Sequence, residues 1–201
     1  MLKTATPDAT GSPQRWFPAG TLIQTDDGPK PIETVTTETH VAVFQESYAK
    51  PVAVSTRQSG PHSDDSVGVW FPRFTIGNAT PICLPKDMQI LLAEYELTEF
   101  VDTPYFTILA RDLVGHWGVK VGPAPQPPSF ALHFEGDTFL NIEGHAYVRL
   151  DGRDTQLEAD EEGFVEVCGE RILNLSGDLL CAYLECIDAQ PQDNGAMSLA
   201  V

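Results

Sequence analysis

From Trp16 onward, apolar and polar positions alternate in the short runs that are typical of β-strands. These runs are rich in Val, Ile, Thr and aromatic residues, and turn signals such as the DDGP sequence at residues 26–29 separate them. The expected strands are residues 21–25, 40–45, 52–56, 67–76, 89–94, 105–109, 130–135, 138–143, 146–150, 163–167 and 171–175. Pro72 predicts a bend or an edge position within the fourth of them. Residues 30–35 fit either a strand or one helical turn.

One segment near the C-terminus has the helical period instead. Apolar residues recur at helical spacing in residues 176–189, with Ser176 as a candidate N-cap. Residues 110–114 fit a short helix. No strand–helix–strand alternation and no fixed-period repeat is visible in the sequence. The pattern therefore predicts an all-β domain whose sheet is closed or folded over, followed by one late C-terminal helix.

Turn signals and composition also divide the chain. The dipeptide Gly136-Asp137 predicts a two-residue hairpin turn between the strands at 130–135 and 138–143. Residues 1–15 are polar and predict a flexible N-terminal arm. The expected organisation is this arm at 1–15, a β domain at 16–150, a β-hairpin plus helix appendage at 151–189, and a loose tail at 190–201.

The composition is that of an ordinary globular protein. The 201 residues are 42% hydrophobic, which is enough for a core of normal size. No apolar run reaches the ~18–20 residues that span a bilayer, and residues 1–14 contain no apolar stretch like that of a signal peptide. We expect a cytoplasmic location, with leaderless export as the alternative.

The net charge argues against several classes of partner. Twelve Lys and Arg stand against 29 Asp and Glu, which gives a formal net charge of −17. Nucleic acid and anionic membrane surfaces repel such a chain, so neither is an expected partner. An unknown protein or small molecule stays open as the partner, and the sequence does not specify the oligomeric state. The acidity itself is typical of a solubilising surface or of a salty habitat.

Residue types that bind metals are present, but not in metal-binding patterns. The cysteines are Cys83, Cys168, Cys181 and Cys186. None of them forms a CxxC pair, and the five histidines are scattered, so no metal or cofactor is expected. Each cysteine has an apolar neighbour, which predicts four buried free thiols in a reducing compartment. The DGRD sequence at 151–154 lacks the further ligands of a calcium loop and is interpreted as a solvated turn. His133 is interpreted as hydrogen-bonded packing within a strand.

The segment WFPAGTLIQTDDGPKPIETV at residues 16–35 carries the most specific pattern. It resembles the opening of the Hint (hedgehog/intein) family, and more closely its bacterial branch, which runs C-F-x-x-G-T-x-I-x-T-x-x-G-x-x-x-I-E-x-L. The matching positions are Phe17, Gly20, Thr21, Ile23, Thr25, Gly28, Ile32 and Glu33, with Val35 as an apolar substitute for Leu. Residues 84–92, 105–114 and 130–144 look like later segments of the family, so the resemblance covers about residues 16–150. It implies a Hint-like, folded-over β-sheet.

The catalytic positions of the family are replaced in this chain. In the family the first motif residue is a Cys, rarely a Ser, whose side chain attacks the preceding carbonyl and forms a thioester; here it is Trp16. The strand His of the family, which polarises that peptide and donates a proton to its nitrogen, corresponds to Met88. The hairpin His corresponds to Asp137, and the Gly-Asp that follows the Ile-Glu turn is Glu38-Thr39. The resemblance therefore implies degenerate positions at Trp16, Met88 and Asp137, and neither self-cleavage nor splicing.

The sequence favours a catalytically inactive Hint-like domain, a pseudoenzyme that acts as a binding or accessory module. Three alternatives stay open. One is a hydrolase of another class that uses carboxylates such as Asp87, Glu135 and Asp137 on the same β scaffold. The second is a structural or assembly protein in which residues 151–189 form an oligomer contact. The third is a relocated nucleophile at Cys83, close in sequence to Met88.

Overall fold

A computed structural model describes residues 15–45, 47–58, 67–93, 103–126, 128–150, 159–167 and 169–189. Within these ranges the strands are β1 (Phe17–Pro18), β2 (Leu22–Thr25), β3 (Gly28–Pro31), β4 (Val41–Val43), β5 (Ser47–Ala49), β6 (Ala53–Arg57), β7 (Val67–Phe71), β8 (Ile82–Leu84), β9 (Gln89–Ala93), β10 (Tyr105–Leu109), β11 (Lys120–Pro123), β12 (Ser129–His133), β13 (Thr138–Ile142), β14 (Ala146–Leu150), β15 (Phe164–Val167) and β16 (Glu170–Asn174). The helical elements in the same ranges are the 3-10 turns η1 (Ile32–Thr34) and η4 (Ala110–Leu113) and the α-helix α1 (Gly177–Ala189).

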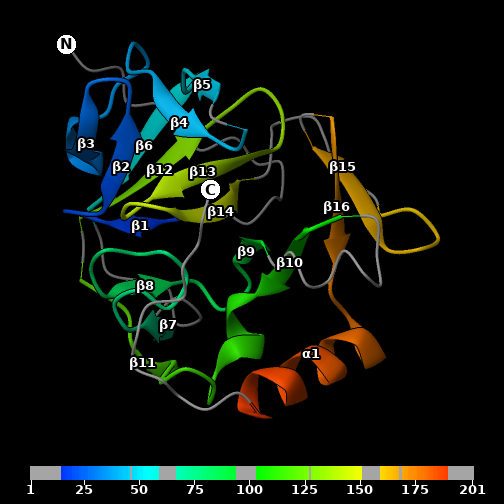
Figure 1. The fold of residues 1–201 in the computed structure, drawn as a ribbon. Coiled ribbons are helices and arrows are strands. Elements are labelled where there is room, and N and C mark those ends of the chain that lie inside the picture. The colour runs from blue at the N-terminus through cyan, green and yellow to red at the C-terminus, as the bar shows by residue number, and fades with distance from the viewer. Residues whose placement is uncertain are drawn as a thin grey trace.

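The strands form three sheets (Figure 1). A ten-stranded sheet has the order β15-β16-β10-β9-β14-β13-β2-β4-β5, with β3 paired to β2. Two three-stranded sheets, β1-β12-β6 and β11-β7-β8, lie beside it. The described part of the chain is thus mostly β-sheet with one α-helix after it, and the expected all-β class with a late helix is confirmed.

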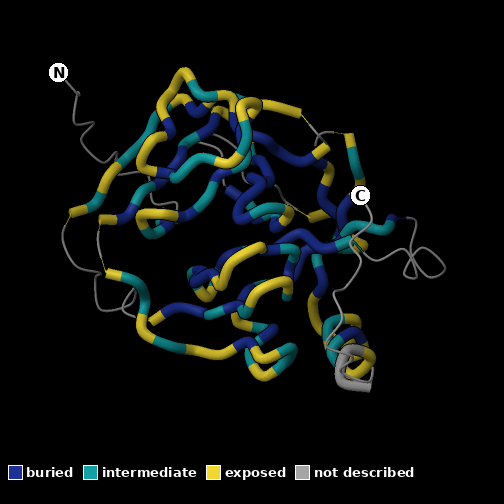
Figure 2. Tube along the Cα trace, turned by 60° about the vertical axis from the view of Figure 1, so that its left-hand side comes forward, coloured by how far each residue is buried: buried dark blue, intermediate teal, exposed yellow. Residues whose placement is uncertain are grey.

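The ten-stranded sheet is apolar on both faces. Side chains alternate along a strand, so Ile90 of β9 faces the main core and Leu91 faces the other side. The main core includes Phe17, Ile23, Met88 and Phe106, all essentially inaccessible to solvent. A smaller cluster on the opposite side contains Phe44, Leu91, Phe139, Val165, Val167 and Ile172. Figure 2 shows these buried segments running through the middle of the molecule. Burial on both faces makes the central strands the most constrained part of the fold.

The C-terminal elements extend the same sheet. Strand β16 pairs in parallel with β10, with Phe106 opposite Leu173 and Thr107 opposite Asn174. Helix α1 packs through Tyr183, whose ring lies edge-on to Phe106 with ring centroids 4.8 Å apart. The β15–β16 hairpin and the helix, both expected from the sequence, therefore share the main core with the strands that precede them.

One predicted hairpin is wrong. The Gly136-Asp137 dipeptide does not join two paired strands, because β12 belongs to a three-stranded sheet and β13 to the ten-stranded one. All five residues of β13 are buried, which suits a central strand packed on both faces rather than one arm of an isolated hairpin. The chain between residues 133 and 138 is thus a crossing between sheets, and β13 pairs instead with β14.

Other expectations divide between confirmed strands and missed ones. The strand at 105–109 and the short helix after it are confirmed, and residues 30–35 resolve into the end of β3 followed by η1. Strand β7 ends at Phe71, directly before the predicted bend at Pro72. Strands β5, β8 and β11 were not predicted, since they are short or contain Pro and Gly.

Several predictions fall outside the described residues. They concern the turn at 151–154, Cys168, the tail from 190 and all of the arm except Arg15. No helix in the described ranges combines the length and apolarity needed to cross a membrane.

Candidate functional site

Hydrogen bonds among its own residues hold the segment at residues 17–33 in a turn. The backbone N–H of Gly20, which has φ +85°, donates to Glu33 Oε2 at 2.8 Å. The Ile32 N–H donates to the Thr21 carbonyl at 2.8 Å, and the Thr21 hydroxyl donates to the Pro18 carbonyl at 2.9 Å. The positive φ explains the glycine, and the hydrogen bonds explain the Thr and Glu. The motif residues thus build the turn that starts the fold, whatever the chemistry of residue 16.

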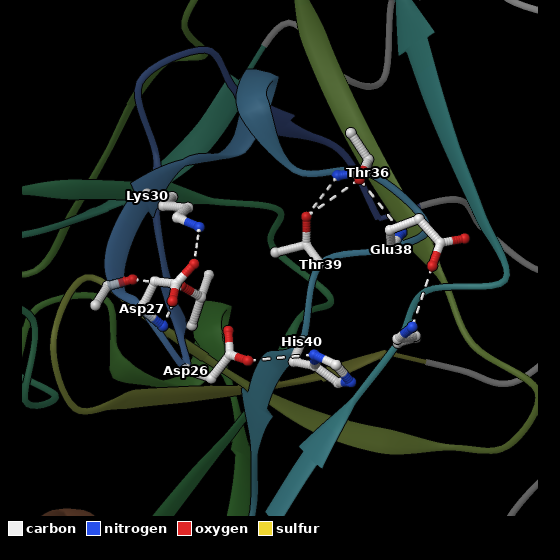
Figure 3. Close-up of polar contacts among 10 residues, drawn as sticks. Asp26, Asp27, Lys30, Thr36, Glu38, Thr39 and His40 are labelled. Carbon is white, nitrogen blue, oxygen red and sulfur yellow. Dashed lines mark hydrogen bonds and ion pairs between the residues drawn. The ribbon is translucent and has the colours of Figure 1, made fainter.

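Two more positions of the motif, Thr25 and Gly28, have structural roles in the β2–β3 turn. The Thr25 hydroxyl donates to the Gly28 carbonyl at 2.6 Å, and Gly28 has φ +101°. Figure 3 shows the exposed polar contacts around this turn, among them Lys30 with Asp27 at 2.8 Å and His40 with Asp26 at 3.2 Å. The hydrogen bond from Lys30 lowers the pKa of Asp27. Exposed pairs of this kind contribute little to stability.

A buried glutamate fastens the opening segment to the centre of the sheet. Glu143 lies in the turn between β13 and β14 with φ +52°, and its side chain is buried. Its carboxylate accepts hydrogen bonds from the Leu22 N–H at 2.8 Å and from the Thr80 hydroxyl at 2.5 Å. A non-glycine residue with positive φ is held there only by such surrounding contacts. Glu143 therefore ties β2, the loop before β8 and the β13–β14 turn to one another.

The chain enters the fold through two anchored residues, Arg15 and Trp16. Arg15 Nη1 donates to the Asp87 carbonyl at 2.8 Å and lies 3.0 Å from Asp87 Oδ2. The guanidinium of Arg57 lies over the Trp16 ring, with its Cζ 4.8 Å from the ring centroid. The next residue, Phe17, is fully buried in β1. The peptide bond before Trp16 is thus flanked by side chains that are each held by a charged group from another strand or loop.

Met88 and the side chain of Asp137 are both buried, but in different surroundings. Met88 is fully buried in the main core and its carbonyl accepts the Ala110 N–H at 2.8 Å. Asp137 Oδ2 lies 2.8 Å from Arg149 Nη2, with only 4% of the Asp137 side chain exposed. Met88 offers a thioether with no proton to give, and the Asp137 carboxylate is engaged by a guanidinium.

Arg149 begins a row of polar side chains that crosses the sheet. Its Nη1 donates to Gln89 Oε1 at 2.5 Å, and Gln89 Nε2 lies 3.4 Å from Asn174 Oδ1, which also accepts the Thr107 hydroxyl at 3.2 Å. We call Asp137, Arg149, Gln89, Thr107 and Asn174 the polar row. It runs from the residue before β13 through β14, β9 and β10 to β16, in the order in which these strands lie in the sheet.

These contacts connect the chain segments that contain Trp16, Met88 and Asp137. Asp87 precedes Met88 and binds Arg15, the residue before Trp16. Gln89 follows Met88 and binds Arg149, which holds Asp137. The links between the three segments therefore run through the two neighbours of Met88. Sequence reasoning missed the arginines at 15, 57 and 149; in a chain with only twelve Lys and Arg, basic residues beside motif segments were the available signal.

The carboxylates considered for a hydrolase do not form a pair in these contacts. Asp87 is bound to Arg15 and Asp137 to Arg149, while Glu135 is exposed. His133 Nε2 lies 2.9 Å from Ser55 Oγ, which confirms the expected hydrogen-bonded packing. Among the described residues, no three His, Cys, Asp or Glu side chains gather as a metal site would need. A shallow depression of about 430 Å³ lies elsewhere, lined by Asp160, Phe164, Val165, Glu166, Gly169 and Arg171.

The expectation of buried cysteines holds at one position and fails at two. Cys83 is buried, and burial raises the pKa of its thiol to about 11, which opposes the thiolate that a relocated nucleophile needs. Cys181 and Cys186 are exposed on α1. The apolar neighbours that suggested burial are next to them in sequence, but adjacent residues of a helix point about 100° apart and do not share its buried face.

Comparisons with known proteins give two partial structural likenesses. No family model and no curated protein matches the chain. A splice-inactive, GSH-linked variant of the AceL NrdHF class 3 split intein is 19% identical, covering 68% of this chain and 97% of that one, with a TM-score of 0.36. A bacterial intein-like domain from Clostridium thermocellum is 15% identical, covering 69% of this chain and 100% of that one, with a TM-score of 0.46.

Proposed function

We propose that this protein is a Hint-like domain that has lost the self-processing reaction and serves as a binding or accessory module. The observation that carries the proposal is Trp16: an indole, under the Arg57 guanidinium, stands where the resemblance requires a sulfur or oxygen nucleophile. Support for the family comes from the opening motif, whose Gly20, Thr21 and Glu33 form hydrogen bonds within the turn that the motif spans.

The replaced residues remove each chemical step of the reaction. Attack on the carbonyl of Arg15 needs a thiol or hydroxyl at residue 16, and an indole provides neither. Protonation of the departing nitrogen needs a titratable group, and Met88 has none. Asp137 is engaged by Arg149 in a buried ion pair, so its carboxylate stabilises the sheet rather than an approaching peptide.

The contacts of Arg15 add a second obstacle. A scissile peptide has to be free to twist and to let its amine leave. Here Arg15 is bonded to both the carbonyl and the carboxylate of Asp87, with only 12% of its side chain exposed. The segment is thereby fixed on both sides of the Arg15–Trp16 bond.

The test measures the intact mass of the full chain during long incubation with a thiol. The expected result is the 22.0 kDa species alone. The variant Trp16→Cys is expected to stay uncut as well, because Met88 and Asp137 remain. The variants Trp16→Phe and Trp16→Ser serve as controls for folding and for an oxygen nucleophile. A fragment cut between Arg15 and residue 16 in the unaltered chain would refute the proposal.

A further inference from the structure

Helix α1 has a wide apolar arc, although it lies on the surface. Its sequence, GDLLCAYLECIDA, carries three acidic residues, Asp178, Glu185 and Asp188, whose spacing places them on one side, and mostly apolar residues elsewhere. A surface helix of a globular protein needs one apolar stripe that faces the core. Figure 1 shows α1 at the margin of the molecule, beyond the end of β16.

The side that packs on the sheets is known from its contacts. Tyr183 is buried against Phe106, and Leu180 and Leu184 are partly buried against the main core. At about 100° per residue these three side chains occupy one face of the helix. The remaining apolar residues of α1 therefore need another explanation.

A second apolar stripe lies on the exposed side. Leu179 is 53% exposed, and Ala182 and Cys186 are exposed as well. Their spacing of three and seven residues stacks them along one line of the helix, flanking the buried face. We call Leu179, Ala182 and Cys186 the α1 stripe. One large side chain followed by two small ones leaves room for another helix to approach closely.

Charge decides what fits the stripe. Asp178 and Glu185 are exposed and lie side by side along the solvent edge of the stripe, since seven residues make about two turns. Residues 177–189 contain neither Lys nor Arg. A second copy would bring the same carboxylates and a net charge of −17 to the contact, which repels it. A cationic segment is attracted instead.

We infer that the α1 stripe is a docking surface for a basic amphipathic helix of a partner protein. The partner's apolar side chains would cover Leu179 and fill the space above Ala182 and Cys186, and its Lys or Arg side chains would reach Asp178 and Glu185. Recognition of an amphipathic helix along an apolar surface with a charged edge is a recurrent mode of peptide binding. The inference does not depend on the loss of the self-processing reaction, because α1 contributes none of the three degenerate positions.

The first test uses a labelled synthetic peptide of about 18 residues, five helical turns, with Leu along one line and Lys on both flanks. Fluorescence anisotropy with the full chain is expected to show saturable binding. The substitution Leu179→Ala is expected to weaken it about tenfold. Val121→Ala, at an equally exposed valine on β11, is the matched control and is expected to change nothing. A peptide of the same composition in scrambled order distinguishes recognition of the amphipathic pattern from attraction by charge alone. Equal binding of the scrambled peptide, or no effect of Leu179→Ala, would overturn the inference.

The second test uses the two native cysteines of α1 as an internal comparison. Both thiols are exposed, but Cys186 lies within about 20° of Leu179 around the helix and Cys181 about 160° away. The bound peptide is expected to slow alkylation of Cys186 several-fold and to leave Cys181 unaffected, as read by mass spectrometry of the digested chain. Protection of neither thiol, or of both equally, would contradict docking on the stripe.

Sedimentation of the full chain without peptide completes the design. A monomer is expected over the concentrations used for binding. A dimer that Leu179→Ala dissociates would assign the stripe to a second copy of the chain and would overturn the proposed partner.

Discussion

The opening segment at residues 17–33 and the polar row are both fixed by a carboxylate, yet in opposite environments. Glu33 is exposed and accepts a neutral backbone N–H, that of Gly20. Asp137 is buried and meets a guanidinium, that of Arg149. An exposed acceptor that loses its bond is rehydrated by water, whereas a buried charge that loses its partner is not. The turn of the opening segment is thus tolerant of change, while the polar row depends on keeping its ion pair complete.

The largest effect is expected from breaking the buried pair. Arg149→Met removes the guanidinium that faces the buried Asp137 carboxylate and is expected to lower the free energy of unfolding by about 3–5 kcal/mol. Urea denaturation followed by circular dichroism measures the loss. The double variant Arg149→Met with Asp137→Asn is the control and is expected to regain most of it. A single-variant loss below about 1 kcal/mol would show that the pair contributes no more than a surface salt bridge.

Substitution of Glu143 is expected to cause an intermediate loss in the free energy of unfolding, because its carboxylate is buried but binds neutral donors. Glu143→Ala removes the acceptor of the Leu22 N–H and of the Thr80 hydroxyl and is expected to cost about 1–3 kcal/mol. Glu143→Gln keeps one acceptor oxygen and should lose less. If the two substitutions were equally damaging in the same unfolding assay, the charge rather than the hydrogen bonds would be what matters.

A smaller loss in the free energy of unfolding is expected from substitution of the exposed carboxylate, Glu33. Glu33→Ala removes the acceptor of the Gly20 N–H, which water can replace, so the expected cost is about 0.5–1.5 kcal/mol. Chemical denaturation of this variant beside Arg149→Met gives the contrast directly. A loss as large as that of Arg149→Met would mean that the opening turn is as constrained as the buried row.

Burial shifts the pKa of the Cys83 thiol, and the effect of this residue on stability is confined to alkaline pH. Burial raises the pKa of its thiol from 9.0 to about 11. Between these values the unfolded chain releases the proton and the folded chain keeps it, so the free energy of unfolding falls as pH rises. Below pH 9 the thiol is protonated in both states and contributes no slope. Unfolding measured across this range should show the decline, and Cys83→Ala should flatten it. An unchanged slope in the variant would assign the decline to other groups.

Local signals made part of this fold predictable. Strand β10 was predicted at its observed bounds because Tyr105–Leu109 is a β-branched and aromatic run between turn signals. The partner of Asp137 was not predictable, since Arg149 is reached only once β13 and β14 pair, and Asp87 lies 72 residues from Arg15. The wrong hairpin at Gly136-Asp137 has the same origin: a turn signal says where the chain bends but not which strands then pair. The motif spacing predicts where a candidate site lies, whereas the ion pairs around it come from contacts distant in sequence.

The parallel pairing of β10 with β16 has a consequence for how the protein is made. Until residue 174 has left the ribosome, one edge of β10 has no neighbour, and Phe106 lacks Tyr183 as its cover. A nascent chain that ends before this point presents an unpaired, apolar edge inside what becomes the largest sheet, a form prone to capture by chaperones or to aggregation. Completion of the ten-stranded sheet during synthesis therefore waits for β16. Truncation before residue 170 would leave the apolar edge of β10 unpaired, in addition to removing β16 and α1.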